Sequence, residues 1–403
     1  MIVVGAGVGG LACALHLRTT GCEVTVLERD CAPGGRRDAV LELDGFRFDT
    51  SPPHPTTMEA LTPEALTPEA LAAPLRAVGE HLGDWIDMLP LDPICRAHYP
   101  DGTTIDVHAE PDRTAASISA ACGAKEAGAY LRFLKLARYG VPPRAVLRDE
   151  RTRRLFGAAA LFGFPVVENA WYPTGGANAV PRMLAGVAEK HGISIRYQME
   201  INGWEGRGDR VTAARTVDGE RLPVDAVVMP GQRRVRSASH LVLHLGSSAR
   251  FSKIAHHNLH FARTWRLARH ELLTRGELMS DPTLLLSAPG QTDPGAAGVY
   301  RVIVPVPNLR AAPVPWGTRA TRTYAGEIMA ILEARGYLDL GASVRVSYVV
   351  SPRDWAEMGM VDGVPCAGGG RAASPHPARA NVVIAGSGLE SGRLAAQRVI
   401  GAL

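Results

Sequence analysis

Three glycines with the spacing Gly-x-Gly-x-x-Gly occur near the start of the chain, at Gly5, Gly7 and Gly10. In this pattern the first glycine permits a tight turn, the second lets the backbone approach a pyrophosphate, and the third allows a helix to pack closely on a strand. Glu28 follows 18 positions after Gly10, close to the offset of about 20 at which a carboxylate accepts hydrogen bonds from ribose hydroxyls. Because an acidic side chain disfavours a ribose 2′-phosphate, these residues predict a site for FAD or NAD rather than NADP.

Positioning these groups requires a strand, a turn and a helix in direct succession. Residues 2–4 predict a short buried strand, residues 5–10 the turn, residues 11–20 a helix, and residues 23–28 a second strand. This βαβ order is the context that the glycine pattern needs. The amide groups at the helix start then face the phosphates, and Gly9 is also predicted to contact the cofactor. An ordinary strand, turn and helix without a ligand is the alternative.

The segment after the second strand adds two more glycines and an arginine. Residues 29–36 read Arg-Asp-Cys-Ala-Pro-Gly-Gly-Arg, and residues 45–50 read Gly-Phe-Arg-Phe-Asp-Thr. Together these segments resemble the start of the flavin amine oxidase superfamily, and within it most closely the bacterial phytoene desaturases. The resemblance implies FAD as the cofactor, and it adds these contacts to the predicted site: Arg29, Gly34, Gly35 and Arg36. Independently of the family, a guanidinium can pair bidentately with a phosphate, whereas a solvated loop cation is the alternative.

Composition limits the class of protein. The chain has 403 residues, of which 46% are hydrophobic and 21% are charged, and its net charge is +4. This length allows two or three domains with sizeable cores, and the balance is that of a globular enzyme. The small net charge does not argue for nucleic acid, although it is compatible with a mild attraction to anionic lipid.

Cysteine and histidine usage argues against a metal site. The six cysteines are scattered and form no Cys-x-x-Cys pair, which favours a reducing cytoplasm. His256 and His257 are adjacent but have no carboxylate or thiol at ligand spacing. No apolar run approaches the ~18 to 20 residues of a transmembrane helix, and the chain begins directly in a strand, so no signal peptide is expected. The longest apolar run, Leu155 to Val167, is core, tunnel lining or a shallow membrane contact.

The stretch that follows the nucleotide-binding start predicts a helical region. Two Thr-Pro-Glu triplets, at 62–64 and 67–69, are plausible helix starts with threonine as the cap and proline at the first helical position. Residues 95–107 predict a hairpin around the turn Asp101-Gly102. Residues 115–164 then follow a mostly helical pattern.

Asp149 and Arg153 are the predicted catalytic pair. Residues 148–156 resemble a helix start that recurs in phytoene desaturases before the substrate cavity, and the resemblance places both side chains near the reacting end of a polyene. In that role Asp149 takes a proton from the substrate, and Arg153 orients the Asp149 side chain. The alternative is a helical ion pair, because residues four apart are neighbours on a helix. An exposed pair of this kind contributes only ~0.3 to 0.5 kcal/mol.

Two later segments extend the predicted cofactor site. Residues 170–176 match the family's Trp-x-Pro-x-Gly-Gly segment, whose paired glycines, Gly175 and Gly176, suit a close approach of the backbone to a cofactor or a strand. A helix is expected over 179–191, followed by the short strands of an antiparallel excursion. In that excursion Ile201 occupies the position where the family touches adenine, and a merely buried strand residue is the alternative.

The C-terminal part returns to the nucleotide-binding fold. Residues 381–388 predict a buried strand that ends in Gly386 and Gly388, with a helix over 391–403. The superfamily uses such a second strand-Gly-x-Gly-helix to close over the flavin. Before this return, residues 239–261 alternate as two strands of a sheet that could form the floor of a substrate site.

Three connections are shorter than in phytoene desaturases, at residues 164–170, 230–237 and 388–391. Family members carry longer helical stretches at the first two positions and a Pro/Gly-rich loop beside the isoalloxazine ring at the third. Either the protein lacks these segments or the written sequence omits residues there. Omission is favoured, because all three points fall at the expected flavin or substrate face, where mobile segments concentrate.

The expected fold is α/β: a Rossmann-like FAD-binding domain of the GR2 type with an inserted substrate domain of mixed sheet and helices. The FAD-binding parts are expected at 1–60, 171–235 and 356–403, and the substrate parts at 61–170 and 236–355. The expected function is carotenoid desaturation, with FAD as cofactor and phytoene or a related polyene as substrate. Because phytoene is a C40 hydrocarbon held in a bilayer, the resemblance also implies a cytoplasmic enzyme attached peripherally to the membrane.

Other functions share these motifs and stay open. A carotenoid isomerase, a ketolase, a retinol saturase type enzyme or an amine oxidase would carry the same cofactor residues. From a different class, the Rab GDP-dissociation inhibitors resemble this fold but bind a prenylated protein and perform no redox chemistry. The intact glycine and glutamate set argues for a real flavin.

Overall fold

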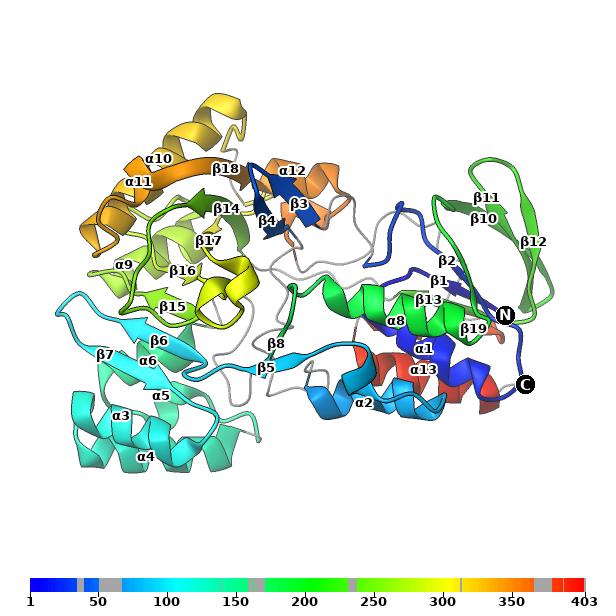
Figure 1. Ribbon diagram of the computed structural model, residues 1–403, viewed down its shortest axis with the longest axis horizontal. Coiled ribbons are helices and arrows are strands. Elements are labelled where there is room, and N and C mark those ends of the chain that lie inside the picture. The colour runs from blue at the N-terminus through cyan, green and yellow to red at the C-terminus, as the bar shows by residue number, and fades with distance from the viewer. Residues whose placement is uncertain are drawn as a thin grey trace.

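The computed structural model describes residues 1–34, 40–50, 67–137, 139–158, 162, 171–230, 238–311, 314–365, 379–386 and 388–401. It has two lobes (Figure 1). One lobe contains both chain ends and a parallel sheet, and the other contains a larger mixed sheet. A two-stranded antiparallel ladder lies between them, formed by β5 (Met88–Pro90) and β8 (Trp171–Pro173).

The first lobe is built on a five-stranded sheet whose strands lie in the order β19, β13, β1, β2, β9. Their bounds are β1 (Ile2–Val4), β2 (Thr25–Leu27), β9 (Ser194–Arg196), β13 (Val227–Pro230) and β19 (Val382–Ala385). Every pairing in this sheet is parallel. The predicted Rossmann-like fold is therefore confirmed, and strands from the two ends of the sequence belong to one sheet.

Helices pack against this sheet and share one apolar cluster with it. They are α1 (Val8–Arg18), α2 (Pro68–Ala77), α8 (Ala179–Lys190) and α13 (Leu389–Gly401). The start of α2 confirms the second predicted Thr-Pro-Glu signal: the Thr67 hydroxyl accepts a hydrogen bond from the Ala70 amide at 3.1 Å, and Pro68 is the first helical residue. The first such triplet, at 62–64, lies outside the described residues.

The helices α1 and α13 meet at two glycines. A Cβ atom at Gly392 would lie 2.2 Å from the carbonyl oxygen of Gly9 and 3.0 Å from the amide nitrogen of Cys13. Both distances are shorter than ordinary van der Waals contact, so the backbones approach this closely only because residue 392 has no side chain. This contact joins the N-terminal and C-terminal parts of the fold.

A small antiparallel sheet extends from the same lobe, as predicted for the region after α8. It consists of β10 (Ile201–Arg207), β11 (Arg210–Thr216) and β12 (Arg221–Pro223). Its buried residues pack against one face of the parallel sheet in a separate cluster that includes Ile2, Leu27, Ile201 and Val227.

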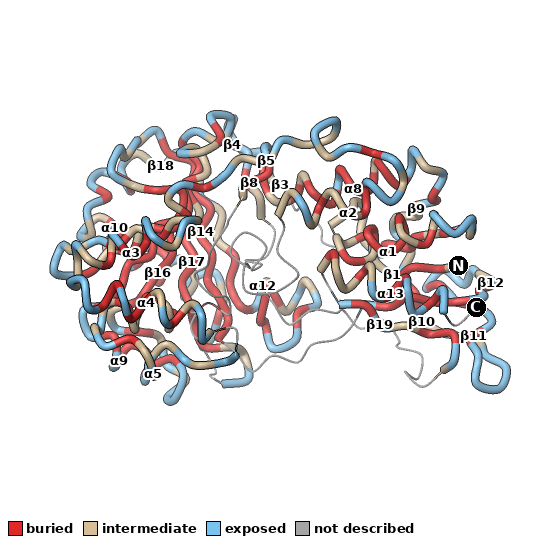
Figure 2. The backbone as a smooth tube through the Cα atoms, turned by 90° about the horizontal axis from the view of Figure 1, so that it is seen from below, coloured by how far each residue is buried: buried red, intermediate tan, exposed pale blue. Residues whose placement is uncertain are grey.

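The second lobe is built on a seven-stranded sheet in the order β18, β14, β17, β16, β15, β6, β7. Its strands are β6 (Cys95–His98), β7 (Thr104–Val107), β14 (Ser239–Ser247), β15 (His257–His260), β16 (Leu284–Ser287), β17 (Val299–Val306) and β18 (Val344–Val350). β6 and β7 confirm the hairpin predicted around Asp101-Gly102. β15 pairs parallel with β6, whereas the other pairings are antiparallel. Figure 2 shows β14, β16 and β17 buried along most of their length.

Each face of this sheet carries its own core. One face shares a cluster with the helical layer of α3 (Pro111–Cys122), α4 (Ala124–Ala137) and α6 (Glu150–Gly157). The opposite face packs against α10 (Thr318–Ala334). Within the described ranges, no helix is long and apolar enough to cross a bilayer.

The remaining elements are β3 (Val40–Leu43), β4 (Phe46–Asp49), α5 (Pro143–Val146), α9 (Trp265–His270), α11 (Leu340–Ser343), α12 (Pro352–Glu357), the π-helical turn η3 (Glu271–Arg275), and the 3-10 turns η2 (Leu82–Asp84), η4 (Pro289–Gln291), η5 (Pro294–Ala296) and η6 (Val361–Gly363).

The contact between α1 and α13 makes a quantitative prediction. We expect Gly392→Ala to lower the free energy of unfolding by about 1 to 3 kcal/mol, because the added methyl overpacks a backbone contact. Gly326→Ala in α10 is the matched control, since a Cβ there meets nothing within 4 Å. That change should be neutral or stabilise by up to about 1 kcal/mol. Urea denaturation measures both, and equal effects of the two changes would contradict the contact.

Candidate functional site

The predicted glycine turn follows β1 directly. Gly5 has φ of +94° and donates its N–H to the Leu27 carbonyl at 2.8 Å. A Cβ at Gly10 would lie 2.1 Å from the carbonyl oxygen of Gly5, which is the close helix–strand contact expected of the third glycine. Among the described residues, a Cβ at Gly7 would meet nothing within 4 Å. This part of the chain therefore leaves open the space over Gly7, at the start of α1, where a phosphate would lie.

Glu28 lies beside this turn with only 4% of its surface exposed. Its Oε2 accepts the amide of Ala6 at 2.7 Å, and its Oε1 accepts the amide of Asp30 at 3.0 Å. Burial raises the pKa of Glu28, and the two amide donors partly oppose this effect. Each carboxylate oxygen keeps further acceptor capacity. Arg29, the next residue, has its Nε 3.9 Å from Asp30 Oδ1.

The second glycine segment reaches the same turn. The Gly34 amide donates to the Ala6 carbonyl at 2.9 Å, and Gly34 has φ of +106°. A Cβ at Gly34 would lie 3.0 Å from Asn178 Nδ2 and 3.2 Å from Pro181 Cγ, so this loop runs close to the start of α8. Gly35 and Arg36 lie outside the described residues.

The C-terminal glycines lie at the same edge of the parallel sheet. Gly386 follows β19, and its amide donates to the Ser391 hydroxyl, while Gly388 directly precedes α13. Since β19, β13 and β1 are parallel neighbours, the ends of β19 and β1 point in one direction. This is the edge at which open α/β sheets bind ligands. The structure thus brings together the two glycine segments that the sequence separates.

Ile201 begins β10 and is 4% exposed. It packs in the same buried cluster as Leu27, and the nearby Met199 amide donates to the Glu28 carbonyl at 2.8 Å. The predicted adenine-contacting residue therefore lies near the predicted ribose-binding residue. Its contact with a cofactor stays a prediction.

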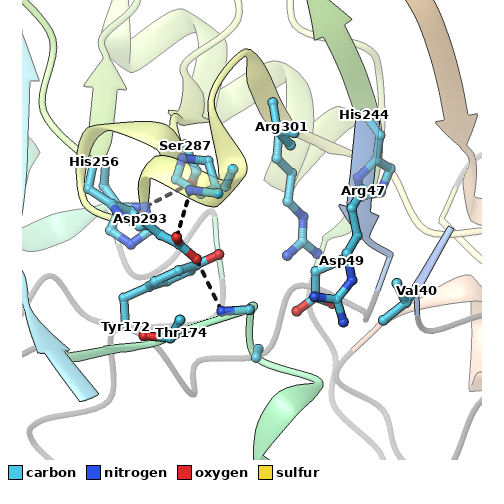
Figure 3. A pocket seen from close by; sticks show the side chains of 18 of the residues that line it. Val40, Arg47, Asp49, Tyr172, Thr174, His244, His256, Ser287, Asp293 and Arg301 are labelled. Atoms are coloured by element: carbon cyan, nitrogen blue, oxygen red, sulfur yellow. Dashed lines mark hydrogen bonds between the residues drawn. The ribbon is translucent and has the colours of Figure 1, made fainter. Parts of the chain in front are cut away.

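A cavity of about 320 Å³ lies between the glycine segment before α8 and the large sheet (Figure 3). Gly175 and Gly176, predicted from the sequence, line it. The Gly175 amide donates to Asp293 Oδ2 at 3.1 Å. Gly176 has φ of +94°, and a Cβ there would lie 3.1 Å from Asp49 Oδ2. These two glycines therefore let the backbone pass close to carboxylates of the cavity wall.

Asp49 and Arg301 form the centre of this wall. Asp49 Oδ2 accepts the Asn178 amide at 3.1 Å at the start of α8. Figure 3 shows Arg301 extending from β17 toward Asp49. Burial lowers the pKa of the Arg301 guanidinium, and the nearby Asp49 carboxylate opposes this effect.

Three histidines line the same cavity. His256 Nδ1 lies 2.9 Å from Thr292 Oγ1, and His257 Nδ1 lies 2.8 Å from Ser287 Oγ. Burial lowers the pKa of His257 to about 4 and holds the pKa of His256 and His244 well below the usual value. All three imidazoles are therefore neutral near neutral pH. Among the described residues, no group of three or more histidine, cysteine or acidic side chains is placed to hold a metal ion.

Sequence reasoning did not select the polar residues of this cavity individually. It placed two strands of a substrate-site floor in 239–261, but the distinguishing signal is narrower. His244 and His257 are polar residues of strands that are buried along their whole length, and Arg301 is the charged residue of the largely apolar strand β17. A buried polar residue in such a strand requires a partner, and that rule could have identified them.

Asp149 and Arg153 both form hydrogen bonds with backbone groups at the start of α6. Asp149 is the N-cap of α6, and its side chain accepts the Arg151 amide at 2.7 Å. Arg153 Nε donates to the Leu147 carbonyl at 2.8 Å. Among the described residues no ion pair joins Asp149 to Arg153, and Arg151 is instead the cation 3.6 Å from Asp149. The predicted helical pair is not formed, because Asp149 stands before the first helical turn, and neither residue lines the cavity. Their catalytic roles stay predictions.

Comparison with known proteins gives a full-length relative. A family model described as an NAD(P)-binding Rossmann-like domain matches residues 3–61. The chain is 33% identical to a phytoene dehydrogenase of Streptomyces griseus, with 100% of this chain and 95% of the relative covered. It is also 25% identical to a zeta-carotene-forming phytoene desaturase of Myxococcus xanthus, with 88% and 81% covered.

The chain belongs to the phytoene desaturase family. It is an oxidoreductase, as the sequence predicted. The alignment with the Streptomyces relative runs over 496 positions, 93 more than the 403 residues of this chain. The relative therefore has segments without a counterpart in this desaturase-family chain, and the location of the short connections stays a prediction.

Solved structures support the fold alone. An oxidoreductase from Methanosarcina mazei has a TM-score of 0.61 at 14% identity, with 99% of each chain covered. A Rab GDI from Plasmodium falciparum has a TM-score of 0.54 at 12% identity, with 100% of this chain and 97% of that chain covered. Because a redox enzyme and a GDI share this architecture, the shape of the chain does not separate their functions.

The open space over Gly7 yields a paired prediction. We expect Gly7→Ala to weaken dinucleotide binding, measured with FAD, at least about tenfold, a loss of roughly 1.4 kcal/mol, because the methyl enters the space where a pyrophosphate would lie. The cofactor-free protein should lose at most about 1 kcal/mol, because Gly7 is the N-cap of α1, where glycine is favoured over alanine, and the methyl meets no atom of the described residues. Gly10→Ala should instead lower the stability of the protein itself, because its methyl meets the Gly5 carbonyl. Flavin fluorescence titration and thermal melting measure the two effects. Unchanged FAD affinity in Gly7→Ala would contradict this placement.

Proposed function

We propose that this enzyme is an FAD-dependent carotenoid desaturase that introduces double bonds into phytoene or a closely related polyene. The observation that carries the proposal is the similarity to a phytoene dehydrogenase along the whole chain at 33% identity. Phytoene is the substrate named for that relative and for the Myxococcus enzyme. The two glycine segments at one sheet edge support it, because they are the parts that a dinucleotide needs.

The described residues fit FAD. The open cradle over Gly7 and the amides at the start of α1 suit a pyrophosphate. The buried carboxylate of Glu28 suits the ribose hydroxyls of the adenosine half. Gly34 at the first segment and Gly386 with Gly388 at the last would hold the rest of the cofactor. FAD supplies, when bound, the capacity to accept a hydride from an allylic carbon.

The chain's own residues then have the tasks of binding, orienting and excluding water. The cavity beside Gly175 and Gly176 would hold the part of the polyene nearest the cofactor. Asp149 as proton acceptor and Arg153 as the group that orients it belong to the proposal through the family resemblance. Their observed tasks at the start of α6 favour a structural role.

Reconstitution tests the proposal directly. The protein is loaded with FAD, supplied with phytoene in liposomes, and followed by visible absorbance. New bands should appear, because each added double bond lengthens the conjugated system. A protein that binds FAD but leaves phytoene colourless with every electron acceptor tried would contradict the proposal. Asp149→Asn keeps a capping side chain but removes the carboxylate, so unchanged turnover in this variant would end the assignment of Asp149 as the base.

The presence or absence of a bound flavin distinguishes the redox functions from the GDI-type function. A purified protein with absorbance at roughly 450 nm carries a flavin, as expected of a cofactor enzyme. A colourless protein that binds prenylated peptides would favour the GDI-type function, whose fold this chain shares. An isomerase, ketolase or amine oxidase would be yellow but would not extend the conjugation of phytoene.

We also propose that the enzyme is cytoplasmic and attaches peripherally to a membrane, since its substrate is a bilayer hydrocarbon. The apolar run first considered for this contact, Leu155 to Val167, does not support it where it is described. Leu155, Ala158 and Phe162 are buried in the core. A better-supported contact is α9 with η3, where Leu267 and Leu273 are 44% and 43% exposed.

The charges around these two leucines favour an anionic lipid surface. Arg266 and Arg269 are exposed on α9, and among the described residues neither forms an ion pair. Basic side chains near an anionic leaflet contribute about 1 kcal/mol each. Exposed leucines flanked by arginines are therefore suited to a shallow contact.

Liposome flotation tests this surface. The double change Leu267→Asp with Leu273→Asp should reduce the fraction floating with phosphatidylglycerol vesicles at least about tenfold, since two apolar contacts are replaced by repelled charges. Val217→Asp is the control, because Val217 is 56% exposed in the turn that follows β11, at the opposite end of the molecule from α9. Equal flotation of all three proteins would exclude α9 and η3 as the contact.

A further inference from the structure

The wall of the cavity contains a carboxylate that backbone amides hold in place, that of Asp293. Asp293 lies on the loop between η4 and η5 and is 7% exposed (Figure 3). Its Oδ2 accepts the Gly175 amide at 3.1 Å, and its Oδ1 accepts the Gly295 amide at 2.9 Å. An ionised carboxylate has about four acceptor sites, so these two bonds leave acceptor capacity on both oxygens.

The charge of Asp293 has no cation beside it in the part of the chain that the structure describes. Among these residues, no arginine, lysine or histidine forms an ion pair with Asp293. The two arginines that line the cavity have other carboxylate neighbours: Arg301 extends toward Asp49, and Arg47 Nε lies 3.7 Å from Glu42 Oε1. Asp293 therefore brings a negative charge into the cavity wall.

The other titratable groups of the cavity are poorer proton acceptors. His244, His256 and His257 would become cations on taking a proton, and burial holds the pKa of each imidazole below its usual value. The Tyr172 hydroxyl already carries its proton, because burial raises its pKa. A carboxylate becomes neutral when it takes a proton, and a buried site favours the neutral form.

The rest of the cavity suits a hydrocarbon. Leu285, Val299 and Ile303 line it from the large sheet. The bond from the Gly175 amide also ties Asp293 to the glycine segment that the family resemblance places beside the cofactor. A polyene segment in this cavity would therefore meet an apolar wall and one negative charge.

We propose that Asp293 is the proton acceptor of the desaturation. The inference rests on the proposed function, because it takes the ligand to be a polyene that a flavin oxidises. One allylic carbon loses a hydride, with both electrons of its C–H bond, to the flavin, which is reduced. The neighbouring carbon loses a proton to Asp293, and the electron pair of that C–H bond becomes the new double bond.

This role uses both the charge and the basicity of the carboxylate. Positive charge builds on the chain as the hydride leaves, and a fixed negative charge in a site shielded from water stabilises it. A C–H bond next to that positive charge is strongly acidic, so a carboxylate is a sufficient base. Asp149, the acceptor that the family resemblance suggests, does not line the cavity.

Chemical rescue tests this role in the FAD-loaded enzyme. Asp293→Ala should lower the rate of phytoene desaturation at least about a hundredfold, the lower end of what a general base contributes. Formate fits the space that the side chain leaves and should raise that rate at least about tenfold. Nitrate is a planar anion of similar size but a far weaker base, so it should not restore the rate. Equal restoration by the two anions would overturn the inference, since charge and hydrogen bonding to Gly175 would then suffice.

Glu271→Ala is the matched control for the rescue. Glu271 is also 7% exposed and accepts a backbone amide, that of Ser280 at 2.9 Å, but it does not line the cavity. Formate should not restore any rate that this variant loses, and an equal gain in both variants would overturn the inference. Thermal melting and the flavin absorbance spectrum establish that each variant is folded and carries FAD.

A binding measurement tests the charge without turnover. Two saturated isoprenoid chains of equal length are compared, one with a quaternary dimethylammonium centre and one with a dimethyl-substituted carbon at the same position. Both are titrated in the same neutral micelles against the FAD-loaded wild-type enzyme and Asp293→Asn, which keeps one acceptor oxygen for the amides. The wild-type preference for the ammonium chain should exceed that of the variant at least about tenfold, because the variant lacks the buried ion pair. Equal preferences would contradict a carboxylate that faces the bound chain.

The outcomes separate this inference from the proposed function. If the wild-type enzyme desaturates phytoene and Asp293→Ala keeps its rate, the inference fails and the proposed function stands. If Asp149→Ala, and not Asp293→Ala, loses the rate and regains it with formate, the acceptor is Asp149 and the inference is overturned. If the wild-type enzyme leaves phytoene unchanged with every electron acceptor tried, the proposed function fails and the inference fails with it.

Discussion

The fold depends on backbone atoms that approach one another where any side chain would intervene. Gly10 lies against the Gly5 carbonyl, and Gly392 lies against the Gly9 carbonyl. These two contacts hold the same short turn, the first from within α1 and the second from α13. The turn is thereby fixed between β1 and the last helix, with its open side over Gly7. A site that is rigid before the ligand arrives loses less entropy on binding.

The Asp49 carboxylate connects the two lobes. Asp49, at the end of β4, accepts the amide of Asn178 at the start of α8, which packs on the nucleotide-binding sheet. Arg301 reaches toward the same carboxylate from the centre of the large sheet. The polar wall of the cavity and the helix layer of the first lobe therefore share one charged group. A shift of either lobe would change the hydrogen bond between Asp49 and the Asn178 amide or the surroundings of Arg301.

Local sequence patterns were sufficient to predict the elements of the nucleotide-binding lobe. They were insufficient to predict the strand register of the large sheet. The turn at Gly5 to Gly10, the acidic residue Glu28 and the Thr67 cap each follow from short-range chemistry, so their elements could be predicted. The pairing of His244 with Arg301 depends on strand register between segments 57 residues apart. Register is set by packing across the whole sheet and has no short-range signal.

The same limit explains the outcome for Asp149. A spacing of four residues predicts a helical neighbour only when both residues lie inside the helix. Asp149 precedes the first turn of α6, where its carboxylate binds a free backbone amide instead. Asp is a favoured capping residue, and this preference competes with the ion pair. Whether Asp149 caps the helix or pairs with Arg153 depends on where the helix begins. Sequence patterns fix this boundary least well.

The position of α13 has a consequence for synthesis on the ribosome. Four strands of the parallel sheet are complete once Pro230 has emerged, but β19 begins only at Val382. Roughly 150 residues are translated in between, which takes about 8 to 30 s at ordinary elongation rates. During this interval the face of α1 that α13 will cover is exposed to solvent. The apolar face of α1 is therefore covered only after the last helix has been translated.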